Sequence, residues 1–390
     1  MKKALFCAVA LMTGIMVFAQ SNVSSITQVG DDHDSQVTQI GLSNESSVTV
    51  NGLENTSFTG QYGSTNISTI EQSGSGNNID VYQYFQNNNS YVSQTGNDND
   101  FEVISDGDGN QSTLYQISND NDGYVYQSGS SQDSYIEQDF GNGNWVASRQ
   151  YAPGPNFSEI RQHGNLDRTD LTQQGAGNNS SDIFQGSSGP LGSSVLILQD
   201  GDSNGSTISQ TGDGNIADLT QTGLGQISRI NQQNATTSSA IVSQNGEGNF
   251  SNVRMVGGTS NTVDIDQDGT NHNSGVSNAF GAGNTVDIDQ EGTGGHRSTA
   301  GQFANYGSSI SVTQSGGGLS HTSTAQQSLG TGNMATVNQT GSGHLSSVYQ
   351  EGQPHPTGGN MATVSQMGDT QISTVSQIGA ANMINVIQNN

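Results

Sequence analysis

Polar and aliphatic residues recur along this chain with a period of eleven. Counting from Gln28 in steps of eleven, glutamine occupies nine of twelve consecutive positions. The residue two places earlier is isoleucine, leucine or valine in ten of the twelve, and the residue four places earlier is serine in eight. A period kept over twelve units indicates a repeat architecture. The nine glutamines are Gln28, Gln39, Gln61, Gln72, Gln83, Gln94, Gln116, Gln127 and Gln138, and the other three positions hold Val50, Ser105 and Arg149.

Asparagine and glycine follow the glutamines at fixed distances. Asparagine stands five residues after the glutamine position in eight successive units, and glycine usually stands two after it, as in Gly30 and Gly41. The unit reads S-x-V-x-Q-x-G-x-x-N-x. Further along, the step lengthens to between 11 and 16 residues, and the chain holds about 32 units. The eight asparagines are Asn44, Asn55, Asn66, Asn77, Asn88, Asn99, Asn110 and Asn121.

This unit predicts a strand followed by a turn. Serine, valine and glutamine alternate with variable residues, so they share one face of a strand of about five or six residues. Glycine and asparagine tolerate positive φ and indicate a tight turn. Such units without helices predict an all-β fold, a β-solenoid of two stacked parallel sheets. Two units would form one rung of about 22–23 residues, which gives about 16 rungs.

The inward face of such a solenoid would be largely polar. A buried amide without a partner costs about 1–3 kcal/mol. Stacking of equivalent residues removes that cost, because an amide can donate to its counterpart on one neighbouring rung and accept from its counterpart on the other. We therefore predict that the glutamines and asparagines named above form structural ladders.

The first residues predict export. Lys2 and Lys3 precede an apolar stretch that ends at Phe18, and cleavage after Ala19 suits a signal peptidase. The expected division is a signal peptide at residues 1–19 and a repeat domain at residues 20–390. Cys7, the single cysteine, lies in the signal peptide. No other stretch is long and apolar enough for a membrane helix, so no transmembrane segment is expected after cleavage.

Prolines mark the expected interruptions, because proline cannot donate a hydrogen bond to a sheet. All five lie where the repeat step lengthens. They predict loop insertions near residues 150–160 (Pro153 and Pro155), 185–195 (Pro190) and 352–362 (Pro354 and Pro356).

Charge and composition argue against two classes of function, nucleic-acid binding and catalysis. The formal net charge of −26 becomes −28 when Lys2 and Lys3 are removed, because six arginines then face 34 acids. This balance argues against nucleic acid as a partner. With 29% hydrophobic residues and 53 glycines, an ordinary enzyme core is not expected. No nucleophile and base can be paired outside the repeat, so we expect no enzymatic activity and no cofactor.

Two related segments raise the question of a metal site. The stretch NTVDIDQDGTN at residues 261–271 returns as NTVDIDQEGTG at residues 284–294. An EF-hand would need a glutamate at its twelfth position, where Gly275 and Ser298 stand instead, and the G-G-x-G-x-D series of calcium-binding repeats is absent. We expect no dedicated metal site. A ladder of outward acids on adjacent rungs would instead raise carboxylate pKa values and bind cations weakly; its members are Asp264, Asp266, Asp268, Asp287, Asp289 and Glu291.

The seven histidines are expected in solvated turns, because none pairs at a metal-ligand spacing; they are His33, His163, His272, His296, His321, His344 and His355. The segment 144–168 departs most from the repeat. It holds Trp145 and three arginines. It is either a docking loop for a nucleator or carbohydrate or, as we prefer, a solvated loop whose arginines offset nearby acids.

The repeats resemble the curlin-repeat proteins, which form curli, the extracellular amyloid fibres of Gram-negative bacteria. The resemblance rests on segments such as IDVYQYFQNNNSYVSQTG (79–96) and SSVYQEG (346–352), and it covers nearly all of the chain after residue 19. Two features depart from the family: the chain is longer than an ordinary curli subunit, and no separate export segment precedes its repeats.

The resemblance implies a secreted structural subunit of curli-like amyloid fibres that supports adhesion and biofilm matrix. Its partners would be further copies of itself, a nucleator subunit and an outer-membrane secretion apparatus. Head-to-tail addition is expected because in-phase repeats reach both ends, MINVIQNN being the last, and an uncapped strand is a template for another chain. A monomeric surface β-solenoid adhesin and a calcium-dependent surface protein remain alternatives.

Overall fold

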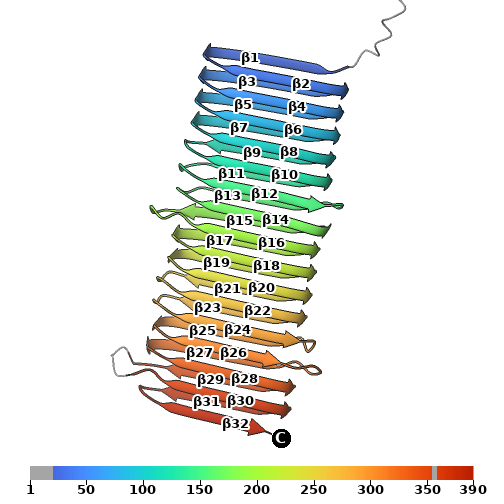
Figure 1. Ribbon diagram of the computed structural model, residues 1–390. Coiled ribbons are helices and arrows are strands. Elements are labelled where there is room, and N and C mark those ends of the chain that lie inside the picture. Colours follow the sequence, from blue (N-terminus) through green and yellow to red (C-terminus); the bar gives the residue numbers. More distant parts are fainter. Residues whose placement is uncertain (1–20, 354–357, 390) are drawn as a thin grey trace, which may run out of the picture.

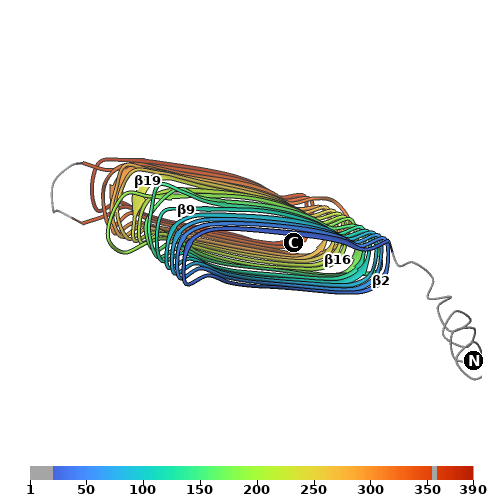
Figure 2. The ribbon, with the colours of Figure 1, turned by 90° about the horizontal axis from the view of Figure 1, so that it is seen from above.

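The computed structural model describes residues 21–353 and 358–389, which form a β-solenoid of 16 coils (Figure 1). Each coil contributes one strand to each of two 16-stranded parallel sheets. Seen from above, the coils superpose into a flattened outline whose long sides are the two sheets (Figure 2). The described residues contain no helix, and therefore none that could cross a bilayer. The predicted fold class and number of rungs are confirmed.

The two sheets take alternate strands of the chain, and we call them the odd sheet and the even sheet. The odd sheet contains, in spatial order, β1 (Val23–Asp31), β3 (Glu45–Leu53), β5 (Ile67–Ser75), β7 (Asn89–Asn97), β9 (Gln111–Ile117), β11 (Asp133–Gln138), β13 (Phe157–Gln162), β15 (Ser180–Ser187), β17 (Gly205–Asp213), β19 (Ile227–Thr236), β21 (Phe250–Val256), β23 (Asn273–Ala279), β25 (Arg297–Tyr306), β27 (Thr322–Thr331), β29 (Leu345–Glu351) and β31 (Ile372–Ile378).

The even sheet follows the same order along the stack. It contains β2 (Asp34–Leu42), β4 (Thr56–Ser64), β6 (Asn78–Gln86), β8 (Asp100–Asp108), β10 (Asp122–Ser130), β12 (Trp145–Ala152), β14 (Arg168–Gly177), β16 (Ser194–Asp202), β18 (Ile216–Leu224), β20 (Ser239–Glu247), β22 (Thr262–Thr270), β24 (Thr285–Gly292), β26 (Ser309–Ser315), β28 (Met334–Ser342), β30 (Met361–Asp369) and β32 (Met383–Asn389).

Register brings equivalent residues of successive coils together. Each strand pairs in parallel with the strand two places later, as when Ile70 of β5 stands beside Val92 of β7 and Gln72 stands beside Gln94. The inward side chains are buried along the stack: Val48, Ile70 and Leu114 are at most 1% exposed. The first coil is different, because Ile26 is 44% exposed.

Most strands are longer than the predicted five or six residues, because the glycine that often stands two residues after the glutamine lies inside the strand; β11 and β13 have six residues. Strands β1 to β8 each span nine residues. Gly52 adopts φ 119° within β3, and a Cβ there would lie 1.8 Å from the carbonyl oxygen of Gly74. The glycine therefore permits a close approach of two coils. The sharp turn comes two residues later, at Glu54 (φ 54°) and its equivalents.

The repeat phase shifts by one residue in the sixth coil. Gln150, not Arg149, stands beside Gln127 in the even sheet, so the prediction that placed Arg149 in the glutamine series is wrong. The step from Gln138 to the next inward glutamine is twelve residues because the connection after β11 is longer than the earlier turns.

The prolines that the structure describes lie between strands. Pro153 and Pro155 connect β12 to β13, and Pro190 connects β15 to β16. Pro354 and Pro356 lie outside the described residues. The expectation that residues 144–168 form a loop is wrong for most of that segment, because it contains β12 and β13.

Candidate functional site

Glutamine side chains form hydrogen-bonded ladders through the interior of the solenoid. In the even sheet, Nε2 of each glutamine from Gln127 to Gln366 donates to Oε1 of the glutamine on the next coil, over distances of 2.8–3.1 Å. A second series in the odd sheet runs from Gln72 to Gln232.

The same amides also join the two sheets. Nε2 of Gln61 donates to Oε1 of Gln83 at 2.8 Å and to the carbonyl oxygen of Glu45, in the other sheet, at 2.9 Å. Its Oε1 has Gln39 as a donor at 2.8 Å. Both N–H groups and the carbonyl oxygen are therefore satisfied, which removes the penalty of burying an amide.

The ladders are interrupted where another residue takes the inward position. Gln28 stands beside Val50 and, instead of joining a ladder, donates to Oγ of Ser35 at 2.9 Å. Ser105 separates Gln83 from Gln127 in the even sheet. Of the other eight predicted glutamines, only Gln83 does not donate to the Oε1 of the next glutamine; its Nε2 donates to Oγ of Ser90 at 3.0 Å. The seven that do are Gln39, Gln61, Gln72, Gln94, Gln116, Gln127 and Gln138.

The asparagines are buried, but their main partners are backbone groups. All eight predicted asparagines are at most 1% exposed. Oδ1 of Asn44 accepts the backbone N–H of Asn66 at 3.1 Å, and Nδ2 of Asn44 donates to the carbonyl oxygen of Gly63 at 3.1 Å. Amide-to-amide bonds also occur, as from Asn77 to Asn55 at 3.0 Å. Each asparagine thus links its turn to the equivalent turn of the next coil mainly through backbone groups. The prediction was a ladder of side chains alone.

Four buried histidines replace asparagine in this series, and His33, which is partly buried, does the same in the first coil. His272, His296, His321 and His344 are at most 1% exposed, so the expectation that they lie in solvated turns is wrong. Their rings stack with centroids 5.0, 4.5 and 4.9 Å apart. The sequence signal was their separation by 24, 25 and 23 residues, which is one coil each time. His355 lies outside the described residues.

Hydrogen bonds select one tautomer of these imidazoles. Nδ1 of His296 faces the backbone N–H of His321, which can only donate, at 3.2 Å. Nε2 lies 3.0 Å from the carbonyl oxygen of Glu291, which can only accept. The ring is therefore neutral with its proton on Nε2. Burial, and then the neighbouring His321 and His272 rings, lower the pKa of His296 to about 4. Burial also lowers the pKa values of His272 and His321.

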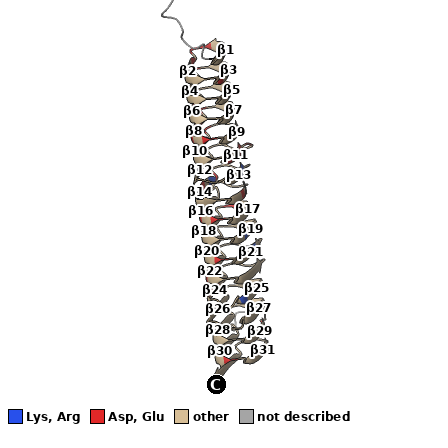
Figure 3. Cartoon of the chain, turned by 90° about the vertical axis from the view of Figure 1, so that its right-hand side faces the viewer, with Lys and Arg blue, Asp and Glu red and all other residues tan. Residues whose placement is uncertain are grey.

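The outward acids of β22 and β24 stand side by side, as the register places Asp264 beside Asp287 and Asp266 beside Asp289. Burial, followed by Asp287 and Asp266, raises the pKa of Asp264. Burial and neighbouring acids also raise the pKa of Asp289. Figure 3 shows acids recurring along the solenoid and few basic residues. Within the described ranges, however, these acids do not bring three ligand atoms within 4.8 Å of one another.

The arginines of residues 144–168 contact acids and rings. Arg149 pairs with Asp170 at 2.5 Å, and Arg161 pairs with Glu159. The guanidinium of Arg168 lies over the ring of Trp145, 3.9 Å from its centroid. These contacts favour the interpretation in which the arginines offset nearby acids.

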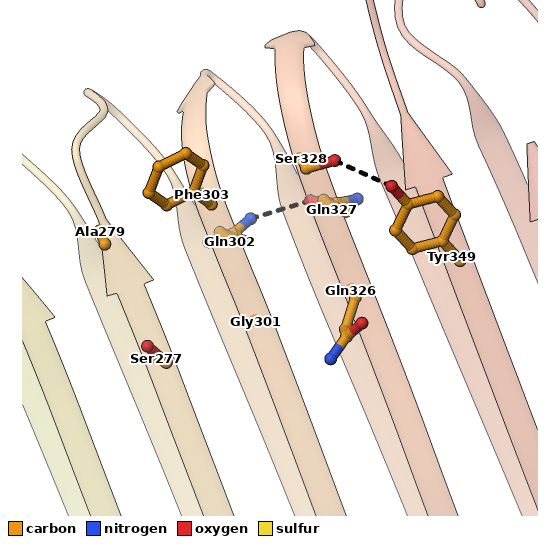
Figure 4. Close-up of a pocket in the computed structure, with 9 residues that line it drawn as sticks. All are labelled: Ser277, Ala279, Gly301, Gln302, Phe303, Gln326, Gln327, Ser328 and Tyr349. Atoms are coloured by element: carbon orange, nitrogen blue, oxygen red, sulfur yellow. Dashed lines mark hydrogen bonds between the residues drawn. The ribbon is translucent and has the colours of Figure 1, made fainter. Parts of the chain in front are cut away.

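A shallow groove on the outer face of the odd sheet is hollowed at Gly301, which has no side chain between Ser277 and Gln326 (Figure 4). Phe303 of β25 and Tyr349 of β29 line it with Ser328 of β27 between them, and the Tyr349 hydroxyl lies 3.4 Å from Oγ of Ser328. Its lining has no carboxylate, imidazole or thiol.

A comparison with protein families agrees with this architecture. The family model described as "Curlin associated repeat" matches residues 52–84, 74–107, 192–223 and 258–292. No curated protein sequence matches the chain. The matched segments lie in regular parts of the solenoid, and the last contains the acids of β22 and β24.

Proposed function

Because this chain belongs to the curlin-repeat family, we propose that it is a secreted structural subunit of curli-like amyloid fibres. It polymerises head to tail and supports adhesion and biofilm matrix outside a Gram-negative cell. It acts as a building block and not as an enzyme. Its partners are further copies of itself, with a nucleator subunit and an outer-membrane secretion apparatus of the curli type.

The end coils carry this proposal. Ile26 in β1 is 44% exposed, whereas its equivalent Val48 is 1% exposed. At the other end, Ile384 and Val386 of β32 pack against the core but are only partly buried. Both ends thus present inward-type side chains to which a further coil can be added, and parallel strands also offer backbone hydrogen-bonding groups there.

The proposal implies that an added copy continues the stacking of coils. In the stack, β30 is followed by β32 and β29 by β31. A second copy added after the last coil places its β2 on β32 and its β1 on β31. The amide of Gln388, which already donates to the carbonyl oxygen of Ile372 at 3.0 Å, can then donate to Gln39 of the added copy. The glutamine ladder of the even sheet thereby continues from one subunit into the next.

Seeded polymerisation tests the proposal. Purified protein without residues 1–19, held at neutral pH, is expected to convert from soluble chains into fibres with a β-sheet circular dichroism spectrum. Sonicated fibres are expected to shorten the lag of fresh protein, and electron microscopy should show fibres in secreted material. Protein that stays monomeric for days with seeds, and melts reversibly, would instead be a monomeric surface solenoid.

A further inference from the structure

Three potential metal ligands lie close together at the carboxyl ends of β11 and β13, two neighbouring strands of the odd sheet. Glu137 lies on β11, Asp139 directly follows that strand, and His163 directly follows β13. Because Gln138 stands beside Gln162, Asp139 and His163 occupy equivalent places on adjacent coils. One ligand atom from each of the three residues lies within 4.8 Å of the other two.

The Asp139 and His163 side chains each leave a buried polar atom without a hydrogen bond. Asp139 is 6% exposed. Its Oδ1 lies 3.2 Å from Nε2 of His163, yet neither atom makes a hydrogen bond among the described residues. A buried acceptor left without a partner costs about 1–3 kcal/mol. A further group held between the two atoms would satisfy both.

The spacing of these atoms fits a metal ion. Zinc binds imidazole nitrogen and carboxylate oxygen at about 2.0–2.2 Å, so two ligands of a tetrahedral ion are about 3.3 Å apart. The 3.2 Å between Oδ1 of Asp139 and Nε2 of His163 matches that separation. One imidazole and two carboxylates suit zinc and its neighbours, whereas calcium and magnesium prefer oxygen ligands alone.

Surrounding groups orient two of the three ligands, His163 and Glu137. The His163 ring is held edge to face between Phe140 and Phe184, with centroid distances of 5.8 and 5.2 Å. The hydroxyl of Tyr135 donates to Oε2 of Glu137 at 3.1 Å. Arg161 approaches the same oxygen at 3.8 Å but also pairs with Glu159. Ligands held by outer contacts of this kind are typical of metal centres.

We propose that Glu137, Asp139 and His163 bind one divalent transition-metal ion, with zinc as the best fit, and that this ion joins adjacent coils of the odd sheet. The fourth coordination position remains for water, because the Glu137 and His163 side chains are 25% and 28% exposed. The ion lies on the side of the solenoid, away from both end coils, so this proposal is independent of fibre formation.

Binding of Co²⁺ and Zn²⁺ to the soluble protein without residues 1–19 tests the site. We expect one Co²⁺ per chain, visible absorption bands of four-coordinate cobalt, displacement by Zn²⁺ and a rise in melting temperature with Zn²⁺. Ca²⁺ at the same concentration should not compete. Asp139→Asn and His163→Gln should each weaken Zn²⁺ binding by at least about 10-fold.

Two further variants keep the test decisive. Glu137→Gln changes a partly exposed side chain, so it should fold even if the buried Asp139→Asn variant does not, and it should also weaken binding. Asp266→Asn, in the acids of β22, should leave it unchanged. The proposal is overturned if the unmodified protein binds no stoichiometric Co²⁺ or Zn²⁺, or if folded Glu137→Gln and His163→Gln variants bind as tightly as it does.

Discussion

The backbone N–H of His321 donates to Nδ1 of His296, one coil away, at 3.2 Å. The same relationship joins His272 to His296 and His321 to His344. It repeats what Asn44 does for Asn66, with an imidazole nitrogen in place of an amide oxygen. Unlike the amide, the imidazole can take up a proton at the atom that must accept the hydrogen bond.

The stacked histidines should make the solenoid sensitive to mild acid. The pKa of His296 is about 4 in the folded chain, against about 6.5 in an unfolded one. Above pH 6.5 both states are neutral and the residue has no effect. Between pH 6.5 and about 4 the unfolded state binds the proton first, so the free energy of unfolding falls by up to about 3 kcal/mol for this residue. Denaturant unfolding measured at pH 7.5 and pH 5 should show the loss.

His296→Asn is the matched variant, since asparagine occupies this position in other coils, as at Asn249. It should reduce the difference in stability between pH 7.5 and pH 5. Carboxylates whose pKa is raised by burial, such as Asp264 and Asp289, have the opposite effect on the pH dependence of stability. They increase the free energy of unfolding as the pH falls through their range. They are common to both proteins, so they cancel in the comparison. An identical pH profile for the variant would contradict the assignment.

A charged side chain in the glutamine ladder should lower the stability of the fold more than an apolar side chain does. Nε2 of Gln173 donates to Oε1 of Gln199 at 2.9 Å and to the carbonyl oxygen of Phe157 at 3.0 Å. Gln173→Glu would direct a buried carboxylate at two acceptors, which we expect to cost at least about 3 kcal/mol at pH 7. Gln173→Met should cost less, about 1–3 kcal/mol, because Met255 already occupies an equivalent buried position. Denaturation midpoints measure both.

The control for the ladder is Gln326→Glu, because Gln326 is exposed on the outer face of β27. It should change the midpoint little. Equal effects of Gln173→Glu and Gln326→Glu would show that the internal hydrogen bonds do not contribute as described.

The alternation of side chains made the ladders predictable, and glycine and asparagine indicated that turns follow the strands, but the exact left-handed position of each turn was not predicted. Glutamines such as Gln61 and Gln83 share one phase because equivalent positions stack. The left-handed turn position, by contrast, holds glycine in some coils, as at Gly76 and Gly109, but Ser43, Glu54 and Thr65 in others, so no single residue type marks it. The metal-type cluster was also missed, because Asp139 and His163 are brought together by a 24-residue coil and by no local motif.

Glycines in the strands and in the turns should differ in their tolerance of substitution. Gly52→Ala forces a side chain into φ 119° and into the Gly74 carbonyl oxygen, and we expect a loss of at least about 2 kcal/mol. Gly225 has φ 65°, and a Cβ at this position would have no other atom within 4 Å. Gly225→Asn should therefore be nearly neutral, since asparagine tolerates this conformation. Thermal melts of the two variants should separate them, and equal melting temperatures would refute this role for Gly52.

Fibre elongation should be stopped by a charge on the inward side of the last strand. Val386 is an inward, partly buried residue of β32, and in the proposed assembly it meets Val37 of the added copy. Val386→Asp keeps its carboxylate near water in the monomer but buries it, unpaired, when another coil is added. A penalty of about 3 kcal/mol raises the critical concentration about 100-fold.

The neighbouring outward residue provides the control. Ile387 is 64% exposed, and Ile387→Asp places the same charge on the same strand facing solvent. Seeded elongation and the residual soluble concentration should be close to those of the unmodified protein for Ile387→Asp and strongly altered for Val386→Asp. Circular dichroism of both monomers must first show an intact solenoid, so that a failure to elongate reports on the end coil alone. Equal elongation by the two variants would mean that subunits do not join through β32.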